Sequence, residues 1–240
     1  MGAFADYTVV PEGLLARMPA TLDFAVAAGV PLAGLTALQA LRDELQLRPG
    51  SRVFISGGAG GVGTFAIQIA RWLGAEVTTT ASERGRALVK RLGADVVIDY
   101  TSQRFEDHVR DMDGVFDLIG GDTLMKSFQV VKPGGKVVSI AGMPEPQTAR
   151  QDLGGGFLLT ALFWAVSYRL RAQAKKHGGT YRYLFMHPSG PELAELGGLI
   201  EEKKLEPVID RVFPFADIAD AFVHLESGHA KGKIVVQMPA

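Results

Sequence analysis

The stretch that decides the fold is Ser56-Gly57-Gly58-Ala59-Gly60-Gly61-Val62-Gly63-Thr64. It follows a short β-branched run and opens a helical pattern, so Gly58-x-Gly60-x-x-Gly63 falls at a strand-to-helix junction. Glycines there let backbone N–H groups and a helix N-terminus approach a phosphate, and the third glycine lets helix and strand pack closely. The loop therefore predicts dinucleotide binding by Gly58, Ala59, Gly60, Gly61, Val62 and Gly63. The alternative is a purely structural glycine turn.

Working outward, short strand-like runs alternate with helical patterns, as in a parallel sheet with crossover helices. Strands are expected over Arg52–Ser56, Glu76–Thr80, Asp95–Ile98, Val115–Ile119, Lys136–Ile140 and Tyr181–Met186. Helices are expected over Gly61–Leu73, Arg84–Leu92, Gln103–Met112 and Asp122–Val130. The predicted fold class is α/β, with a doubly wound parallel Rossmann sheet of about six strands.

The flanks carry further expected elements. A strand over Phe4–Val10 is expected at the N-terminal end. After the sheet, helices are expected over Pro191–Lys203 and Phe215–Ser227, and strands over Pro207–Phe213 and Lys233–Gln237.

The tip of the second strand indicates which dinucleotide is bound. An acidic residue about 20 positions after the loop would bind a ribose 2′-hydroxyl and disfavour a 2′-phosphate. That position holds Ser82, followed by Glu83, Arg84 and Arg86. A hydroxyl with guanidinium groups favours NADP over NAD, although Glu83 argues the other way. The alternative for the arginines is a solvated helix start. Tyr100, at the end of the third strand, is expected to flank the adenosine or to be a sheet-edge aromatic.

Composition excludes several classes of protein. The chain has 240 residues, 47% of them hydrophobic, and 25 Lys+Arg against 26 Asp+Glu give a net charge of −1. The chain therefore lacks the overall positive charge that is typical of a nucleic-acid-binding protein. There is no cysteine, so Cys-ligated metals, thiol nucleophiles and disulfides are excluded. The five histidines are dispersed without ligand spacing, and no metal is expected.

Leu153–Tyr168 is an uncharged, strongly apolar run followed by Arg169, Arg171, Lys175 and Lys176. It is shorter than the roughly 20 residues that span a bilayer, so stable membrane insertion is not expected. We expect an amphipathic or buried helix with a basic C-terminal end, and contact with a membrane surface is the alternative. Coverage of a substrate cleft or of a partner surface also stays open.

Several segments together resemble the medium-chain dehydrogenase/reductase superfamily, specifically its zinc-independent quinone or enone oxidoreductase branch. They are Pro31–Leu38, the glycine loop, Leu92–Tyr100, Phe116–Gly121, Lys132–Lys136 and Gly228–Lys233. The resemblance implies that Thr36 lies near the pyrophosphate or nicotinamide of the cofactor, and that Ile119 and Gly120 contact its ribose. It also implies that Lys231 and Lys233 help to close over NADP. No catalytic residue is assigned.

The resemblance also implies a division of the chain. Residues 1–30 are expected to be a remnant of a GroES-like β-barrel catalytic domain, and residues 31–188 the NADP-binding Rossmann domain. Residues 189–240 are expected to be a C-terminal return segment that packs with the catalytic domain. The resemblance further implies that most of that catalytic domain, with one wall of the substrate pocket, is missing from this sequence, as a fragment, a mis-started reading frame or a natural truncation would each explain.

The implied function is an oxidoreductase that transfers hydride from NADPH to an activated C=C bond or a quinone without zinc. Its partner is a small electrophile, an enone or quinone, with no nucleic acid. A homodimer is implied, and a cytoplasmic location is expected because no signal peptide is visible. The alternative is a truncated, non-catalytic NADP-binding module that acts as a redox sensor or partner-binding protein.

Overall fold

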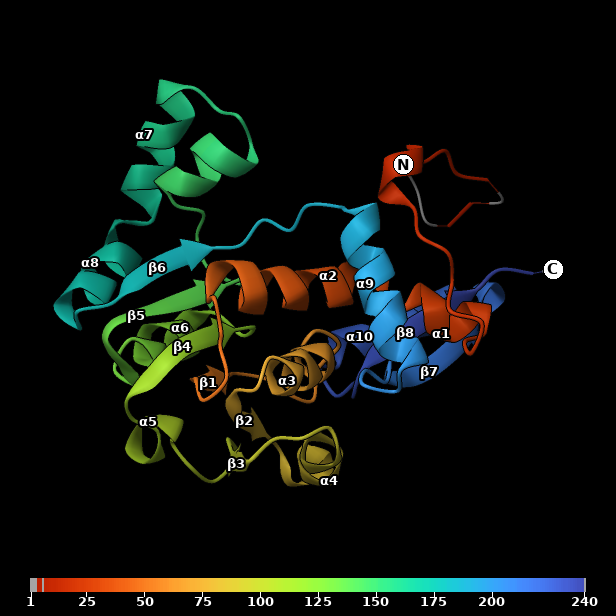
Figure 1. The fold of residues 1–240 in the computed structure, drawn as a ribbon, viewed down its shortest axis with the longest axis horizontal. Coiled ribbons are helices and arrows are strands. Elements are labelled where there is room, and N and C mark those ends of the chain that lie inside the picture. The colour runs from red at the N-terminus through yellow and green to blue at the C-terminus, as the bar shows by residue number, and fades with distance from the viewer. Residues whose placement is uncertain (1–3, 6, 240) are drawn as a thin grey trace.

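A six-stranded parallel sheet forms the centre of the molecule in a computed structural model, which describes residues 4–5 and 7–239 (Figure 1). Its strand order is β3-β2-β1-β4-β5-β6, and every pair of neighbours is parallel. The strands are β1 (Arg52–Ile55), β2 (Glu76–Ala81), β3 (Val96–Asp99), β4 (Met112–Asp117), β5 (Val131–Ser139) and β6 (Thr180–Tyr183). This is the doubly wound order that reverses between β1 and β4, so the predicted fold class is confirmed.

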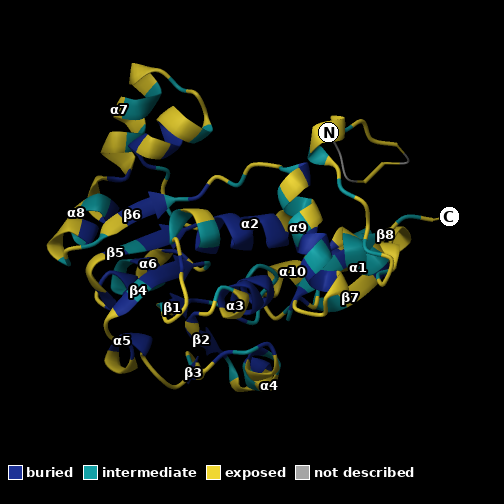
Figure 2. Ribbon diagram, in the orientation of Figure 1, coloured by how far each residue is buried: buried dark blue, intermediate teal, exposed yellow. Residues whose placement is uncertain are grey.

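Helices connect the strands and cover both faces of the sheet (Figure 1). The helices are α1 (Phe24–Ala28), α2 (Pro31–Leu38), α3 (Gly63–Trp72), α4 (Glu83–Arg91), α5 (Phe105–His108), α6 (Gly121–Ser127), α7 (Phe157–Val166), α8 (Tyr168–Lys176), α9 (Gly190–Glu201) and α10 (Ile218–Glu226). Successive side chains of β1 point to opposite faces of the sheet and therefore belong to two different hydrophobic clusters. Val53 and Ile55 pack in one with α2, α3 and α9, whereas Phe54 packs in the other and stacks on Phe105 at a centroid distance of 4.7 Å. Both clusters are buried beneath the helices (Figure 2).

The C-terminal segment forms a separate small sheet. In it, β7 (Ile209–Pro214) pairs in parallel with β8 (Lys233–Gln237), and α1 and α10 pack on β8. The expected elements of this segment are present. A 3₁₀ turn over Phe215–Asp217 replaces the first turn of the expected helix.

Two expected elements are wrong. The helix expected over Gln103–Met112 is only the short α5, because Val109 turns to an extended conformation and Asp111 has a positive φ of 56°. Val109 and Met112 are both buried, which an extended segment entering β4 achieves. The strand expected over Phe4–Val10 is absent from residues 4–5 and 7–10, and position 6 lies outside the described residues.

The apolar run forms α7, which ends at Ser167, where α8 begins in a new direction (Figure 1). None of the residues of α7 is buried, so the expectation of a buried helix is wrong. Among residues 4–5 and 7–239, no helix is long and apolar enough to cross a bilayer.

A buried guanidinium attaches the edge strand β6 to the rest of the fold. Arg182 is 4% exposed and binds the carboxylates of Glu44, Glu145 and Asp152 at 2.8–3.0 Å. Burial alone would lower the pKa of Arg182, but the hydrogen bonds that it donates to Glu44 and Asp152 raise it above its ordinary value. The charge is therefore held permanently inside a ring of carboxylates that lie far apart in the sequence.

Replacing Arg182 by Met removes this cation and leaves three largely buried carboxylates without it. We expect Arg182→Met to lower the free energy of unfolding by about 3–5 kcal/mol, the usual cost of breaking a buried ion pair from one side. Chemical denaturation measures it. Arg91→Met, which removes an exposed pair with Glu206, serves as the control and should leave the midpoint unchanged. Equal stability of the two variants would show that the Arg182 cluster does not hold β6.

Candidate functional site

The glycine loop is held by the end of the neighbouring strand β2. The N–H of Gly57 donates to Oγ1 of Thr80 at 2.9 Å, and the N–H of Gly58 donates to the carbonyl of Thr80 at 3.0 Å. Gly57 has a φ of +75°, which favours glycine. The loop then turns directly into α3. Within the described part of the chain, no residue accepts a hydrogen bond from the N–H groups of Gly61, Val62 or Gly63. These are the free donors of a helix N-terminus.

Two of the glycines are needed for packing. A Cβ on Gly63 would lie 2.3 Å from the carbonyl oxygen of Gly57 and 2.7 Å from Cα of Gly58. A Cβ on Gly58 would lie 2.2 Å from Oγ1 of Thr79 in β2. Packing against Thr79 therefore requires a glycine at position 58, whereas the sequence pattern predicts that the approach of a phosphate requires this glycine. Gly60 is different, since its Cβ would meet only the oxygen of Gly57, at 3.4 Å, and it lines a cavity.

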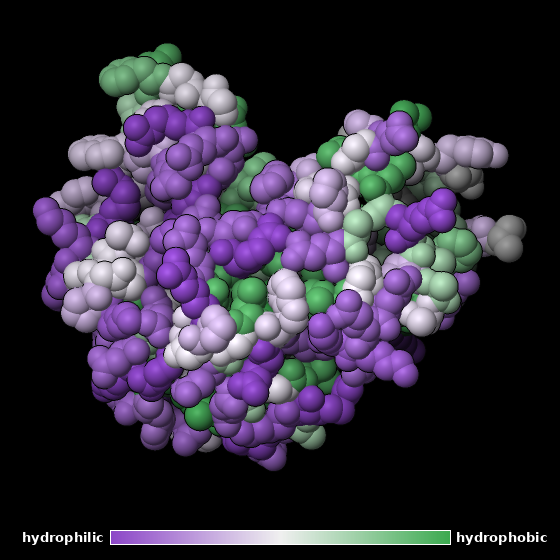
Figure 3. Space-filling view, in the orientation of Figure 1, coloured by the Kyte–Doolittle hydropathy of each residue, from purple (hydrophilic) through white to green (hydrophobic). Residues whose placement is uncertain are grey.

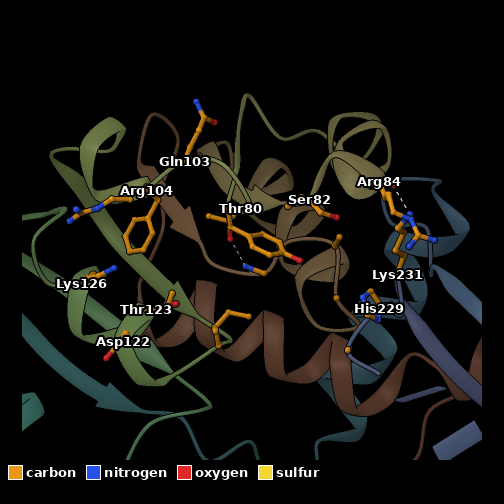
Figure 4. A pocket seen from close by; sticks show the side chains of 18 of the residues that line it. Thr80, Ser82, Arg84, Gln103, Arg104, Asp122, Thr123, Lys126, His229 and Lys231 are labelled. Carbon is orange, nitrogen blue, oxygen red and sulfur yellow. Dashed lines mark hydrogen bonds between the residues drawn. The ribbon is translucent and has the colours of Figure 1, made fainter. Parts of the chain in front are cut away.

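That cavity, of about 530 Å³, lies at the carboxyl ends of β1, β2, β3 and β4, and so includes the switch point between β1 and β4. Figure 4 shows its side chains from close by. Half of the residues expected at the site line it: Ala59, Gly60, Ser82, Arg84, Tyr100, Ile119 and Lys231. Ligands of doubly wound sheets bind at this place. The sequence reasoning missed Thr80, Gln103, Thr123, Lys126 and His229, which also line it. Only the position of Thr80 at the end of a predicted strand could have indicated it.

One end of the cavity is cationic. Ser82 precedes α4, and its hydroxyl makes no capping hydrogen bond to a described residue. Arg84 follows it, and Nζ of Lys231 donates to the carbonyl of Arg84 at 2.5 Å (Figure 4). Glu83 is absent from the cavity lining and pairs with Arg86 at 2.8 Å. This end therefore offers a hydroxyl and two cations to an anion.

The opposite end of the cavity carries Arg104 and Lys126, and its charges are compensated (Figure 4). Both bind the carboxylate of Glu106, at 3.0 and 3.1 Å. Burial by itself would raise the pKa of Glu106, but hydrogen bonds from the backbone, Lys126 and Arg104 hold it below its ordinary value. The two ends of the cavity are therefore chemically distinct, and only the Ser82 end is free for an anion.

A buried carboxylate shapes the wall formed by Ile119 and Gly120. Asp117, at the end of β4, accepts hydrogen bonds from Ser56 at 3.0 Å, Ser139 at 2.8 Å and the N–H of Gly120 at 3.0 Å. Gly120 has a φ of +77°, and a Cβ there would lie 2.4 Å from the carbonyl of Ala141. Asp117 thus joins the ends of β1, β4 and β5 and positions Ile119 at the cavity.

The C-terminal loop lies against the glycine loop. The N–H of Gly232 donates to the carbonyl of Ala59 at 3.0 Å, and Gly60 forms a bridge with Gly232. Lys233 extends over Gly61, so that a Cβ on Gly61 would lie 2.8 Å from Cδ of Lys233. Burial lowers the pKa of Lys233, and no described carboxylate pairs with it.

A second cavity, of about 450 Å³, begins where the first one ends. Gly60 lines both, and Gly61, Val62 and Lys233 line the second. The ammonium of Lys233 and the free N–H groups at the start of α3 therefore face the same cavity. Both favour an anion there.

The remaining expected residues lie outside both cavity linings. Thr36 is buried in α2, and its hydroxyl donates to the carbonyl of Leu32 at 2.6 Å. Gly58, Gly63 and Gly120 act through the backbone packing described above. Across residues 4–5 and 7–239, no three His, Asp or Glu residues lie together as a group that could hold a metal ion.

Comparisons with known proteins identify the family. A family model described as zinc-binding dehydrogenase matches residues 92–236. The chloroplastic NADPH-dependent alkenal/one oxidoreductase of Arabidopsis thaliana is 38% identical over 239 residues, which are 98% of this chain and 53% of the relative. The mitochondrial NAD(P)H oxidoreductase RTN4IP1 of Danio rerio is 36% identical over 99% of this chain and 63% of its own length.

Among solved structures, the quinone oxidoreductase from Coxiella burnetii matches with a TM-score of 0.77 and 35% identity, over 91% of this chain and 62% of that one. The chain thus spans between about half and two thirds of the length of these relatives. By its family model, its relatives and its fold, the chain belongs to the medium-chain dehydrogenase/reductase superfamily, in the branch of quinone and enone oxidoreductases.

Proposed function

We propose that this chain is the cofactor-binding part of an NADPH-dependent reductase of activated C=C bonds or quinones that works without a metal. The observation that carries the proposal is the cationic end of the larger cavity, where Ser82, Arg84 and Lys231 meet without a carboxylate in the lining at that end. A ribose 2′-phosphate fits this donor set, because guanidinium and ammonium groups bind phosphate by charge-assisted hydrogen bonds. The relatives named above act with NADPH or NAD(P)H, which supports the same assignment.

The residues present fit the other parts of such a cofactor. The free N–H groups at the start of α3, together with Lys233, would hold its pyrophosphate. Ile119 and Tyr100, which are 57% and 62% exposed and line the cavity, would contact the adenosine. Gly120, fixed by Asp117, would place its backbone near the ribose.

When bound, reduced nicotinamide supplies a hydride to the electrophilic carbon of the substrate, and a proton completes the two-electron reduction. The protein contributes binding and orientation, so the site needs no nucleophile. A homodimer and a cytoplasmic location remain predictions.

Arg84→Ala tests the 2′-phosphate site. We expect it to weaken NADPH binding by about 10- to 100-fold, since a hydrogen bond to a charged group contributes about 1.5–3 kcal/mol. Binding of NADH, which lacks this phosphate, should change by less than about twofold. Fluorescence titration of both cofactors measures the effect. Arg86→Ala is the matched control, because Arg86 binds Glu83 and the carbonyl of Val97 rather than the cavity. Equal losses for NADPH and NADH would contradict the assignment.

Lys233→Met tests the pyrophosphate site. The substitution removes a half-buried cation without a described counter-ion, so the free protein should be as stable as before or slightly more so. We expect NADPH to bind about tenfold more weakly. At an NADPH concentration 100 times the original Kd, the stabilisation of the protein by bound NADPH should therefore fall from about 2.7 to about 1.4 kcal/mol. Thermal unfolding with and without NADPH gives both values. A large loss of stability in the free protein, with NADPH binding unchanged, would show that the lysine is structural.

Oxidation of NADPH against a panel of enones and quinones tests the reaction itself. The proposal predicts turnover with at least one of these electrophiles, unchanged by a chelator. NADPH binding without turnover on the whole panel would favour the non-catalytic module instead.

A further inference from the structure

The exposed apolar side chains of α7 have no role in the proposed reaction. Phe157 and Leu158 in α7 are 83% and 84% exposed, and Leu162 and Trp164 are both 55% exposed. Only one side of α7, with Leu159 and Phe163, is partly covered. Side chains of this size are ordinarily buried, and a contiguous exposed patch of them marks a contact surface.

This surface is a projecting tip. The helix α7 stands away from the sheet, on the opposite side of the molecule from β7 and β8 (Figure 1). Hydrophobic residues gather at its top, with hydrophilic residues below them (Figure 3). A protruding apolar tip is suited to enter a deformable apolar layer.

The charge around the tip has one sign. From Leu153 to Pro191 the sequence contains no Asp or Glu, although the whole chain carries 26 of them and has a net charge of −1. Arg169, Lys175 and Lys176 in α8 are exposed, and no described carboxylate pairs with them. The cations directly follow the apolar helix. Cations of this kind, beside an apolar helix, are attracted to the negative surface of an anionic membrane.

The junction between α7 and α8 carries side chains suited to a lipid headgroup layer. Trp164 and Tyr168 lie 6.3 Å apart, and both are more than half exposed. The guanidinium of Arg171 lies over the ring of Trp164 at 5.1 Å and donates to its carbonyl at 2.6 Å. Trp and Tyr are enriched at the boundary between acyl chains and water, and Arg extends its charge into the headgroups.

We propose that α7 and α8 dock the protein on the surface of an anionic lipid bilayer, with α7 inserted to the level of the acyl chains and the cations of α8 on the lipid phosphates. A bilayer accounts for both features together, because acyl chains suit the apolar side chains of α7 and lipid phosphates suit the cations of α8. A second copy of the chain is the competing occupant, and its test follows below. The proposal does not depend on the bound cofactor or the reaction.

Flotation with vesicles tests it. We expect the chain to bind vesicles of phosphatidylcholine with 30% phosphatidylglycerol and to bind pure phosphatidylcholine vesicles much more weakly. Raising the salt concentration to 0.5 M should release it, because the electrostatic part is screened. In a Trp72→Phe background, Trp164 is the remaining tryptophan of the chain, and its emission should shift to shorter wavelength on binding. No binding to anionic vesicles at low salt would overturn the proposal.

Two double variants, each with a matched control, separate the electrostatic and the apolar contributions to vesicle binding. Arg169→Gln with Lys175→Gln should lower the partition coefficient about 25-fold, at about fivefold for each cation. Lys203→Gln with Lys204→Gln, exposed cations beyond α9, should leave it unchanged. Leu158→Ser with Leu162→Ser should abolish the Trp164 shift, whereas Val212→Ser with Val223→Ser, exposed positions of β7 and α10, should not.

The oligomeric state provides the opposing outcome. Analytical ultracentrifugation without lipid compares the unchanged chain with the Leu158→Ser, Leu162→Ser variant. We expect both to have the same oligomeric state, because α7 does not form a dimer interface. If the unchanged chain forms a dimer that these two changes dissolve, and vesicles are not bound, a second copy covers α7 and the membrane proposal is wrong.

Discussion

The absence of a side chain at Gly63 is the constraint on which the rest of the site depends. A single carbon there would overlap the carbonyl of Gly57 and the backbone of Gly58, so α3 could not start where it does. Because α3 starts there, its free N–H groups lie beside the carboxyl end of β1, at the point where the strand order reverses. The site is therefore a consequence of backbone packing, and the anion-binding groups are placed around it.

Two polar side chains transmit this geometry to the neighbouring strands. Thr80 receives the N–H of Gly57 and thereby joins the glycine loop to β2. Asp117 is fully buried and receives donors from Ser56, Ser139 and Gly120, which joins β1, β4 and β5. A buried carboxylate is costly unless its hydrogen bonds are satisfied, and here they are satisfied by groups whose positions it fixes. The lining of the cavity is therefore preorganised before any ligand binds.

The fold, and five of the seven expected residues that line the larger cavity, followed from local patterns in the sequence. β-Branched runs and the glycine spacing predicted the sheet, and Ser82 and Arg84 were found by counting from the loop. Contacts between distant segments were not predictable in this way. Lys231 came from a family resemblance, and its contact with Arg84 depends on a β7–β8 pair formed some 150 residues later. The helix expected over Gln103–Met112 failed because the burial of Val109 and Met112 overrode local helix propensity.

The apolar segment shows the limit of composition most clearly. Its lack of charge predicted an amphipathic or buried helix, yet no residue of α7 is buried and only the side with Leu159 and Phe163 is partly covered. The hydropathy of a segment indicates that it avoids water but does not indicate what it packs against. For Thr36, resemblance alone placed the residue at the cofactor, whereas its hydroxyl is used within α2.

The central claim is that Ser82, Arg84 and Lys231 form a site for the 2′-phosphate of NADP. A crystal structure of the protein with NADPH tests this most directly. The account predicts the 2′-phosphate within hydrogen-bonding distance of the Ser82 hydroxyl and the Arg84 guanidinium, with Lys231 nearby and the pyrophosphate over the start of α3. A 2′-phosphate that points into solvent, or a cofactor that avoids this end of the cavity, would contradict it.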